Sequence, residues 1–246
     1  MLLILPPSET KRDGGPDASR LELGQLGFAS LTPQRTESIA ALIALSRSVE
    51  KSTAALKLGA TQRFEIDRNR ALLSSPVMPA LDRYTGVIYD AVDAATLSPR
   101  ARDFAAHHLA IGSALFGLLR AEDCIPAYRL SHDSRLPGHS LPTLWRAPVA
   151  AELAQHEGFL LDLRSEAYAA LGRAPLGAFY LRVLSEGADG RRKALSHFNK
   201  RAKGDFTRRV LEAGIVHESA DSLIRWSQSN GIILDFGAPA ELNLVV

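Results

Sequence analysis

The chain has 246 residues, of which 46% are hydrophobic and 23% charged, and its formal net charge is only +2. These values are ordinary for a soluble globular protein of one large or two small domains. No apolar run approaches the roughly 18 to 20 residues that span a bilayer, and the opening segment lacks the features of a signal peptide. A single cysteine excludes an internal disulfide, as expected of a cytoplasmic protein, and no His or Cys cluster predicts a metal or another cofactor.

Capping residues and apolar spacing predict the elements of the first half of the chain. Leu2–Leu5 is a continuous apolar run that Pro6 ends, which is typical of a buried parallel strand. Thr32 followed by Pro33 predicts a helix start, with Thr32 as the N-cap. The helices expected in this half cover residues 32–59, with a break near 47–49, then 79–92 and 98–109.

The second half begins with the apolar segment 109–119, which contains Gly112 and Gly117. This segment fits either a strand or a tight helix-turn-helix, and a loop follows it. The later elements expected are helices over 143–155, 165–171, 195–213 and 221–229, and strands over 159–163, 179–184, 232–236 and 242–246, with a turn at 187–190. Because no regular βαβ period, repeat or linker is visible, we expect one compact domain over 1–246, of mixed α/β (α+β) class, with a central mixed sheet and surrounding helices.

A cationic run over 191–209 holds eight Lys or Arg residues and a single acid. Segregated positive charge in a nearly neutral chain indicates an anionic partner, such as the phosphates of a nucleic acid or a nucleotide. On a helix, Lys200 and Lys203 share one face, with Arg201 and Arg208 near it, while apolar residues of the same helix dock on the core. The alternative is a charged helix face that is simply solvated.

Two loop-like segments also gather polar groups. PPSETK, at 6–11, follows the first strand, and its Lys11 would extend a basic surface. RAEDCIPAYR, at 120–129, places Arg120 and Arg129 next to a glycine-containing segment whose backbone amides can hold an anion. The alternatives are an ordinary turn for the first segment and a structural salt bridge of Asp123 for the second.

A third segment, DLRSEAY at 162–168, begins at a strand end and runs into a helix. Ligands gather at the carboxyl ends of strands in α/β sheets, so Glu166 is a candidate acid/base and Tyr168 a candidate stacking or hydrogen-bonding group. Helix capping by Ser165, with Glu166 in the first turn, explains the same residues without any function.

Taken together, these segments resemble the YaaA family of bacterial peroxide-stress proteins. The family pattern has a short PPSETK-like block after the first strand, then a GLYGVLRPLD…PYRLEM-like block, an N-L-A-S-x-E-Y-like block and a late K-x-A-R-G-like block. Here the blocks are ILPPSETK, SALFGLLRAEDCIPAYRL, DLRSEAY and KRAKG, in the same order across essentially the whole chain.

The chain departs from that pattern at several positions. Glu9 stands where many members have Lys. Asp162 and Arg164 replace Asn and Ala, and Lys203 replaces Arg, which keeps the charge but loses the bidentate fork. Cys124 stands where the family usually has an apolar residue, which favours a buried or half-buried structural thiol over a peroxidase nucleophile.

The resemblance implies a compact mixed α/β fold with a positively charged cleft. It also implies DNA binding through a helix-hairpin-helix-like element, for which residues 112–117 are the best candidate. The biological role that it implies is limiting oxidative DNA damage during peroxide stress, linked to intracellular iron.

Two hypotheses from different classes follow. In the first, the protein binds duplex or bubble DNA through its phosphates, and the residues that would contact them are Lys11, Arg120, Arg129, Lys200, Arg201, Lys203, Arg208 and Arg209. In the second, an enzyme acts on a small anionic or nucleobase-like molecule in a mixed-charge cleft, and its catalytic residues would be Glu9, Glu166 and Tyr168. An interaction protein without chemistry is a third hypothesis.

The arrangement of four residues distinguishes the two main hypotheses. One pocket that brings together Glu9, Arg129, Glu166 and Lys200 would favour the enzyme, because small ligands bind in enclosed concave sites. A long open groove lined by cations would favour DNA binding.

Overall fold

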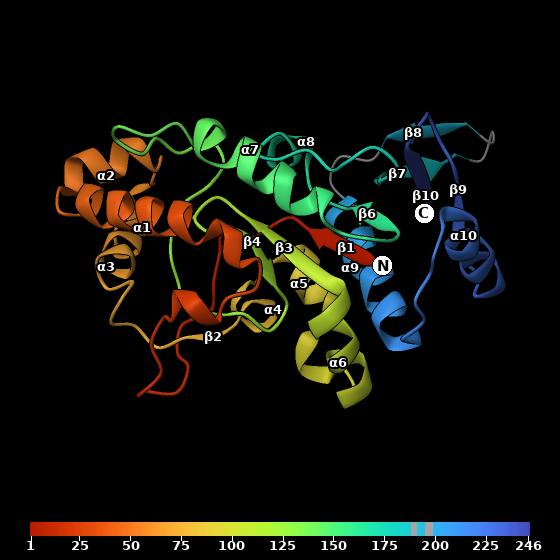
Figure 1. Cartoon of the computed structure of the whole chain (residues 1–246), viewed down its shortest axis with the longest axis horizontal. Helices are drawn as coiled ribbons and strands as arrows, with labels where there is room; N and C mark the ends of the chain where they lie inside the picture. Colours follow the sequence, from red (N-terminus) through yellow and green to blue (C-terminus); the bar gives the residue numbers. More distant parts are fainter. Residues whose placement is uncertain (188–190, 195–198) are drawn as a thin grey trace.

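A mixed sheet forms the centre of the molecule. The computed structural model of the protein describes residues 1–187, 191–194 and 199–246. Within these residues the strand order is β4-β3-β1-β6-β7-β10-β9, and β8 pairs with β7 (Figure 1). The strands of this sheet are β1 (Leu2–Leu5), β3 (Leu109–Ser113), β4 (Gly117–Arg120), β6 (Leu160–Asp162), β7 (Phe179–Glu186), β8 (Arg192–Ala194), β9 (Ile233–Phe236) and β10 (Glu241–Val245), while β2 (Met78–Pro79) and β5 (Cys124–Ile125) form a separate pair.

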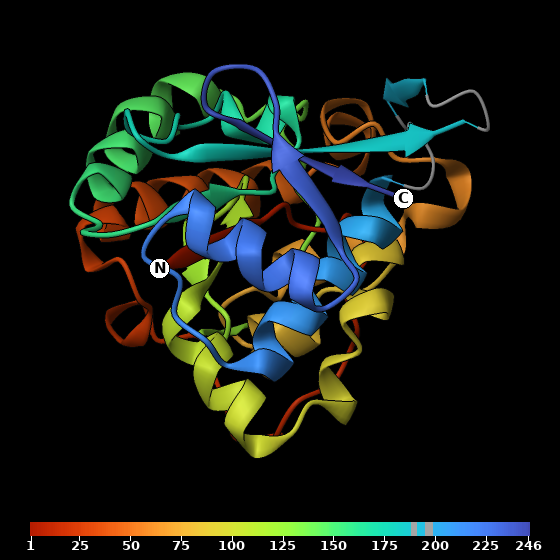
Figure 2. The same ribbon diagram turned by 90° about the vertical axis from the view of Figure 1, so that its right-hand side faces the viewer.

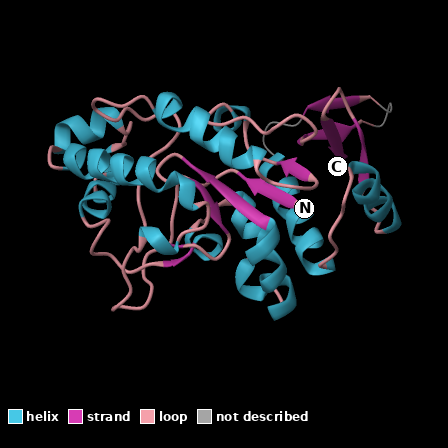
Figure 3. Ribbon diagram, in the orientation of Figure 1, coloured by secondary structure: helices cyan, strands magenta, loops and turns pink. Residues whose placement is uncertain are grey.

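Helices cover both faces of the sheet (Figures 2 and 3). They are α1 (Thr32–Ser46), α2 (Val49–Ala55), α3 (Phe64–Arg70), α4 (Ala80–Arg83), α5 (Val87–Val92), α6 (Pro99–His108), α7 (Leu141–Ala154), α8 (Glu166–Ala169), α9 (Asn199–Ala213) and α10 (Ala220–Ser229). α1 and α7 lie on one side of β1, β3 and β6, and α5, α6 and α9 lie on the other (Figure 1). The predicted mixed α/β fold with a central mixed sheet and surrounding helices is confirmed.

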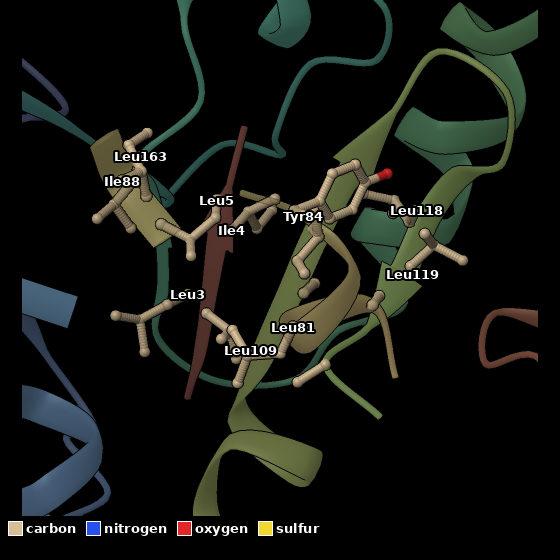
Figure 4. Packing of buried hydrophobic residues seen from close by; sticks show 14 of the residues in the cluster. Leu3, Ile4, Leu5, Leu81, Tyr84, Ile88, Leu109, Leu118, Leu119 and Leu163 are labelled. Carbon is tan, nitrogen blue, oxygen red and sulfur yellow. The ribbon is translucent and has the colours of Figure 1, made fainter. Parts of the chain in front are cut away.

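β1 lies in the middle of the parallel part of the sheet. Leu3 pairs with Leu109 of β3, and Leu2 pairs with Leu160 of β6. All four residues of β1 are buried because helices cover both faces of the sheet, which explains why the strand is continuously apolar. Figure 4 shows its side chains packed among those of the neighbouring strands and helices. The strand predicted over Leu2–Leu5 is confirmed.

The chain leaves the ends of β1 and β6 in opposite directions. After β1, the next strand of the sheet along the chain is β3, on one side of β1, whereas after β6 it is β7, on the other side. β1 and β6 are parallel neighbours, so their carboxyl ends lie together at the point where these connections diverge. Such a switch point leaves a crevice outside the carboxyl ends of the strands, where ligands of open α/β sheets bind.

The segment 109–119 forms strands rather than helices. β3 and β4 pair antiparallel, with Ser113 opposite Gly117, and the residues of the turn between them are buried. The strand alternative is therefore confirmed. The helix-hairpin-helix-like element expected at 112–117 is wrong for this segment, because a tight β-hairpin inside the core presents no helix ends to a ligand.

The helix expected over 79–92 is divided into α4 and α5. Lys11 forms a β-bridge with Tyr84, so the loop after β1 pairs with the chain between the two helices. Gly86 then adopts a φ of 92°, a left-handed conformation that glycine enters readily. This tertiary pairing overrides the helical spacing of the sequence, and it fixes the position of the loop over 6–11.

Other boundaries differ from the expected ones by a few residues. α1 begins at Thr32 itself, so Leu31 occupies the N-cap position that was expected for Thr32. α9 is described from Asn199, and the expected helix start at 195 lies outside the described residues, as do residues 188–190 of the expected turn. The sequence had not suggested α3.

Candidate functional site

A cleft of about 820 Å³ opens at the carboxyl ends of β1 and β6. Its walls come from the loop after β1, the start of α5, the segment around α8, β7 and the first turns of α9. The ionisable side chains of Glu9, His132, Glu166, Arg182, Lys200 and Lys203 lie on its lining. The cleft therefore occupies the switch point of the sheet and carries both signs of charge.

The side chain of Lys11 fixes the conformation of the loop over 6–11 by bonding its backbone. Its ammonium donates to the carbonyl oxygens of Ser8 (2.9 Å) and Glu9 (3.2 Å) and lies 4.1 Å from the centre of the Tyr128 ring. Burial lowers the pKa of Lys11 to about 7. Lys11 therefore shapes the loop, and because its side chain is buried, it is not part of the basic surface that was expected.

An ion pair joins this loop to the segment 120–129. Glu9 Oε2 lies 2.7 Å from a terminal nitrogen of Arg129. Arg129 is buried, its backbone N–H donates to Asn69 (2.8 Å), and within the described residues its Nε has no hydrogen-bond partner. Glu9 lines the cleft, and Arg129 is linked to the cleft through this carboxylate.

The segment after β6 both caps α8 and contributes side chains to the lining of the cleft. Ser165 Oγ accepts a hydrogen bond from the backbone N–H of Tyr168 (3.4 Å), so Ser165 is the N-cap of α8, as the sequence predicts. Glu166 and Tyr168 both line the cleft. The ring centre of Tyr168 lies 5.1 Å from that of His132. Burial raises the pKa of the Tyr168 hydroxyl, which therefore stays protonated and can donate a hydrogen bond.

Lys203 lies on the lining of the cleft although it is only 4% exposed. Its ammonium donates to the carbonyl oxygen of Leu163 (2.9 Å), and the centre of the Tyr180 ring is 5.1 Å away. Burial lowers the pKa of Lys203 to about 8, although the charge of Asp162 favours the protonated form. Lys203 is therefore a desolvated amine at the edge of a large cleft.

Asp162 and Arg164 form a buried pair close to Lys203. The guanidinium of Arg164 donates from Nε to Oδ1 of Asp162 (2.9 Å) and from a terminal nitrogen to Oδ2 (2.7 Å). The two residues that depart from the family pattern in this block therefore compensate each other. In the described part of the chain, no carboxylate lies within ion-pair distance of Lys203.

The remaining cations of α9 do not share one face. Lys200 is exposed and lines the cleft. Arg201 and Arg209 line a second hollow, of about 560 Å³, between α9 and the strands β9 and β10. Arg208 pairs with Glu212 (2.7 Å) and donates to the last carbonyl of α5 (2.8 Å). The positive charge that is contiguous in the sequence is thus divided among three environments.

Arg120 is not part of the cleft. Its guanidinium lies 4.4 Å from the centre of the Phe28 ring and donates to the backbone of His107 (3.2 Å). Asp123 accepts from the backbone N–H groups of Arg120 (2.8 Å) and Gly27 (2.9 Å). Asp123 therefore pins this segment structurally, through backbone amides instead of the salt bridge that was the alternative.

Sequence reasoning missed the contribution of β7. Tyr180 and Arg182 line the cleft, and they alternate along the strand with the buried Leu181 and Val183. This alternation of apolar and polar residues in FYLRVLSE was the signal that could have found them. Arg182 is held by Glu241 of β10 (2.7 Å), which fixes its position on the sheet.

Cys124 has the properties of an unactivated thiol. It is exposed, so the expectation of a buried or half-buried thiol is wrong. Partial desolvation raises the pKa of the thiol, and the charges of Glu122 and Asp123 raise it further. Nucleophilic cysteines have a lowered pKa, so these surroundings do not favour a peroxidase nucleophile.

Two further features concern the described residues as a whole. None of their helices combines the length and apolarity needed to cross a bilayer. In this part of the chain, no three residues among His, Cys, Asp and Glu are arranged to hold a metal ion.

Fold and cleft together define a single-domain α/β protein with a mixed-charge cleft at the switch point of its sheet. Within that class, the chain belongs to the family described as peroxide stress protein YaaA, whose family model matches residues 1–231. The resemblance predicted from the four blocks is therefore confirmed.

Several relatives match nearly the whole chain. A UPF0246 protein of Corynebacterium efficiens is 46% identical over 253 residues, which cover 100% of both chains. A UPF0246 protein of Corynebacterium glutamicum strain R is 42% identical over 240 residues, covering 96% of this chain and 95% of the relative. A UPF0246 protein of Streptomyces coelicolor is 39% identical over 249 residues, covering 98% and 94%.

Proposed function

We propose that the protein binds a small anionic ligand of about nucleotide size in the cleft and catalyses a reaction on it. The observation that carries the proposal is the presence of Glu9, Glu166 and Lys200, from distant segments, on the lining of one cleft of about 820 Å³. This volume lies in the range of about 300 to 1,000 Å³ that is typical of small-molecule sites. Arg129, the fourth residue of the expected set, is bonded to Glu9.

The distribution of charge supports an anionic ligand with a polar remainder. Arg182 of β7 and Lys200 and Lys203 of α9 supply positive charge for a phosphate or a carboxylate. Glu9 and Glu166 lie on the same lining, where phosphate binding alone would not require them. Their presence favours a ligand that also needs an acceptor or a proton-transfer group.

Three groups are suited to proton transfer and recognition. Glu166 and Glu9 are the candidate acid/base residues, and Tyr168 is the candidate for stacking or hydrogen bonding. A hydroxyl cluster adds further donors and acceptors: Thr10 Oγ1 lies 3.2 Å from Ser8 Oγ and 2.9 Å from Thr85 Oγ1. These hydroxyl groups lie on the same lining and can hydrogen-bond a sugar or a nucleobase.

DNA is the second candidate ligand. In that case the protein would act in the cytoplasm to limit oxidative DNA damage during peroxide stress, with a link to intracellular iron. The observation that favours it is the exposure of Lys200, Arg201 and Arg209 on α9, because exposed cations can contact successive phosphates. In this case one nucleotide of the strand would occupy the cleft, and the exposed cations would contact its neighbours.

Calorimetric titration of the intact protein with inorganic pyrophosphate and with adenosine 5′-monophosphate tests the first candidate. We expect Lys200→Glu to weaken both affinities by about 10-fold, which corresponds to about 1.4 kcal/mol. Lys51→Glu makes the same charge change at an exposed position of α2 and should leave both affinities unchanged. Failure of both anions to bind, or equal effects of the two variants, would contradict the proposal.

Duplex and bubble DNA test the second candidate. Affinity that depends on phosphate contacts should fall steeply between about 50 and 200 mM salt, by about 0.9 log units per log of salt for each phosphate neutralised. Charge reversal at Lys200 should reduce that slope. An affinity that does not change with salt would exclude binding through these cations.

A further inference from the structure

Lys203 is a buried amine whose hydrogen-bonding capacity is largely unused. Lysine is almost never fully buried without a charged partner, because desolvation of an ammonium is costly. Within the described residues, the Lys203 ammonium uses one of its three N–H donors, in the hydrogen bond to the Leu163 carbonyl, so two donors remain. The carboxylate of Asp162 is engaged on both oxygens by Arg164. Lys203 therefore has capacity left for a ligand in the cleft.

The surroundings of Lys203 favour the neutral amine. Burial lowers its pKa to about 8, and the positive charge of Arg182 acts in the same direction, while Asp162 and Glu166 oppose it. About a quarter of such an amine is neutral at a pH of about 7.5, against about 0.1% of an ordinary exposed lysine. A desolvated lysine beside another cation is a recognised form of activated nucleophile.

We propose that Lys203 is a nucleophile that forms a Schiff base with an aldehyde or a ketone that carries phosphate. The inference rests on the proposed function of the cleft and adds the reaction class. The lone pair of Nζ attacks the carbonyl carbon, an N–C bond forms, and the π electrons of the carbonyl move to its oxygen, which takes up a proton. The nitrogen loses a proton to give a neutral carbinolamine, whose hydroxyl takes up a second proton and leaves as water. The resulting iminium loses its remaining N–H proton, so that the net products are one imine and one water molecule.

Other residues of the cleft supply the remaining requirements of this reaction. Burial raises the pKa of both Tyr168 and Tyr180, so their hydroxyl groups stay protonated and can donate to the carbonyl oxygen. Glu166 lines the same cleft and can accept the proton that leaves the nitrogen. Lys200, exposed on the preceding turn of α9, is positioned to hold a phosphate.

Lys11 provides an internal comparison for this assignment. Its pKa is lower than that of Lys203, about 7 against about 8. Its ammonium, however, is bonded to two carbonyl oxygens of its own loop, packs against the ring of Tyr128, and does not lie on the cleft lining. Burial alone would make Lys11 the more reactive amine, whereas access to the cleft selects Lys203.

Two examples of molecules that carry a carbonyl group beside phosphate are relevant to this cleft. One is a free sugar phosphate in its open-chain form, and the other is an abasic site in DNA, where the ring-opened sugar is an aldehyde between two phosphates. Both place an anionic group close to the reacting carbon, as the positions of Lys200 and Lys203 require.

Reductive trapping tests the inference on the intact protein. The protein is incubated with glyceraldehyde 3-phosphate, or with an oligonucleotide that contains an abasic site, in the presence of sodium cyanoborohydride. Mass spectrometry after digestion locates the modified lysines. We expect an adduct at Lys203 that forms on the order of 10- to 100-fold faster than at the exposed Lys51 and Lys57, because more of the amine is neutral. The rate should rise with pH through a midpoint of about 8. The probe that reacts faster identifies the source of the carbonyl group.

Matched controls keep this test decisive. Lys203→Arg retains the charge but removes the nucleophile, so it should abolish the adduct, whereas Lys51→Arg should leave adduct formation at Lys203 unchanged. A second measurement needs no variant: excess inorganic pyrophosphate should slow labelling of Lys203 and not of Lys51. Equal labelling of all lysines, preferential labelling of Lys11, or no adduct with either probe would overturn the inference. Pyrophosphate binding measured by calorimetry reports separately on the proposed function, which survives if the anion binds and Lys203 does not react.

Discussion

The loop after β1 and the first turns of α9 each bury one lysine, and the two surroundings differ in a way that separates structure from function. Lys11 is bonded to two carbonyl oxygens of its own loop and packed against Tyr128. Lys203 has one carbonyl partner in the described residues and lines the cleft. Burial lowers the pKa of both. A lowered pKa therefore marks each lysine as a desolvated amine. Of the two, only Lys203 also has N–H donors without a partner among the described residues and a place on the cleft lining, so only Lys203 can bind a ligand there.

The largest effect should come from the buried pair of Asp162 and Arg164, which lies close to Lys203. Asp162→Asn or Arg164→Ala alone leaves one buried charge without its partner, which should lower the free energy of unfolding by about 3 to 5 kcal/mol. The double variant restores the two residues of the family pattern, and it should cost at least about 2 kcal/mol less than the sum of the single variants. Urea unfolding of the four proteins measures this coupling, and additive losses would show that the residues do not act as a pair.

A displacement of α9 should move Lys203 relative to the cleft, because Lys203 lies on α9. A Cβ atom at Gly204 would lie 2.4 Å from the carbonyl oxygen of Ile88 and 2.7 Å from Cβ of Ala91, so α9 and α5 approach each other closely there. Gly204→Ala should lower the free energy of unfolding by about 1 to 3 kcal/mol and weaken pyrophosphate binding. Gly24→Ala, where a Cβ meets no atom within 4 Å, is the matched control. Equal stability of the two variants would argue against a close helix contact.

The pH dependence of the free energy of unfolding tests whether the pKa of Lys11 is lowered in the folded protein. Its pKa is about 7 in the folded protein and about 10.4 in an unfolded chain, so above a pH of about 7 the unfolded state holds more protons. Stability should therefore rise with pH, by up to about 1.4 kcal/mol per pH unit for this one group. Lys11→Met lacks the effect and keeps the contribution of Lys203. Between pH 7 and pH 9, urea unfolding should show a larger rise in the free energy of unfolding for the original protein than for Lys11→Met. An equal rise in the two proteins would contradict the prediction.

The smallest effect concerns the ion pair that links the Lys11 loop to Arg129. The Glu9 side chain is 59% exposed, so Glu9→Gln should cost about 1 kcal/mol or less in the free energy of unfolding. Glu157→Gln, at an exposed position without a described ion pair, should cost nothing measurable. Thermal unfolding of both variants makes the measurement. A loss above about 3 kcal/mol would mean that Arg129 depends on Glu9 as a buried charge depends on its only partner.

Local patterns predicted much of the fold because they reflect local causes. The apolar run of β1, the Ser165 cap and the alternating strand β7 follow from burial and backbone chemistry within a few residues. The division between α4 and α5 was not predictable in this way, because it depends on pairing of Tyr84 with Lys11, which is distant in the sequence.

The site was predicted as a set of segments and not as a set of contacts. The four blocks identified Glu9, Glu166 and Lys200, which do line one cleft. The burial of Lys203 had a signal that was not used: it lies three and seven residues before Phe206 and Val210, on the apolar stripe of α9. The sequence does not indicate that Arg120 stacks on the Phe28 ring or that Arg208 bonds the Val92 carbonyl, because only the fold brings these partners near.

The position of β1 in the sheet has a consequence for how the protein is made. β1 is synthesised about 100 residues before β3 and about 150 residues before β6, which begin at Leu109 and Leu160, so its pairing must wait for distant segments. At a translation rate of about 5 to 20 residues per second, about 10 to 40 s separate β1 from α9 on the ribosome. Contacts of such high sequence separation also form slowly once the chain is complete. Until β3 and β6 have been made, the apolar segment Leu2–Leu5 of a nascent chain therefore has neither of the strand partners that bury it in the folded protein.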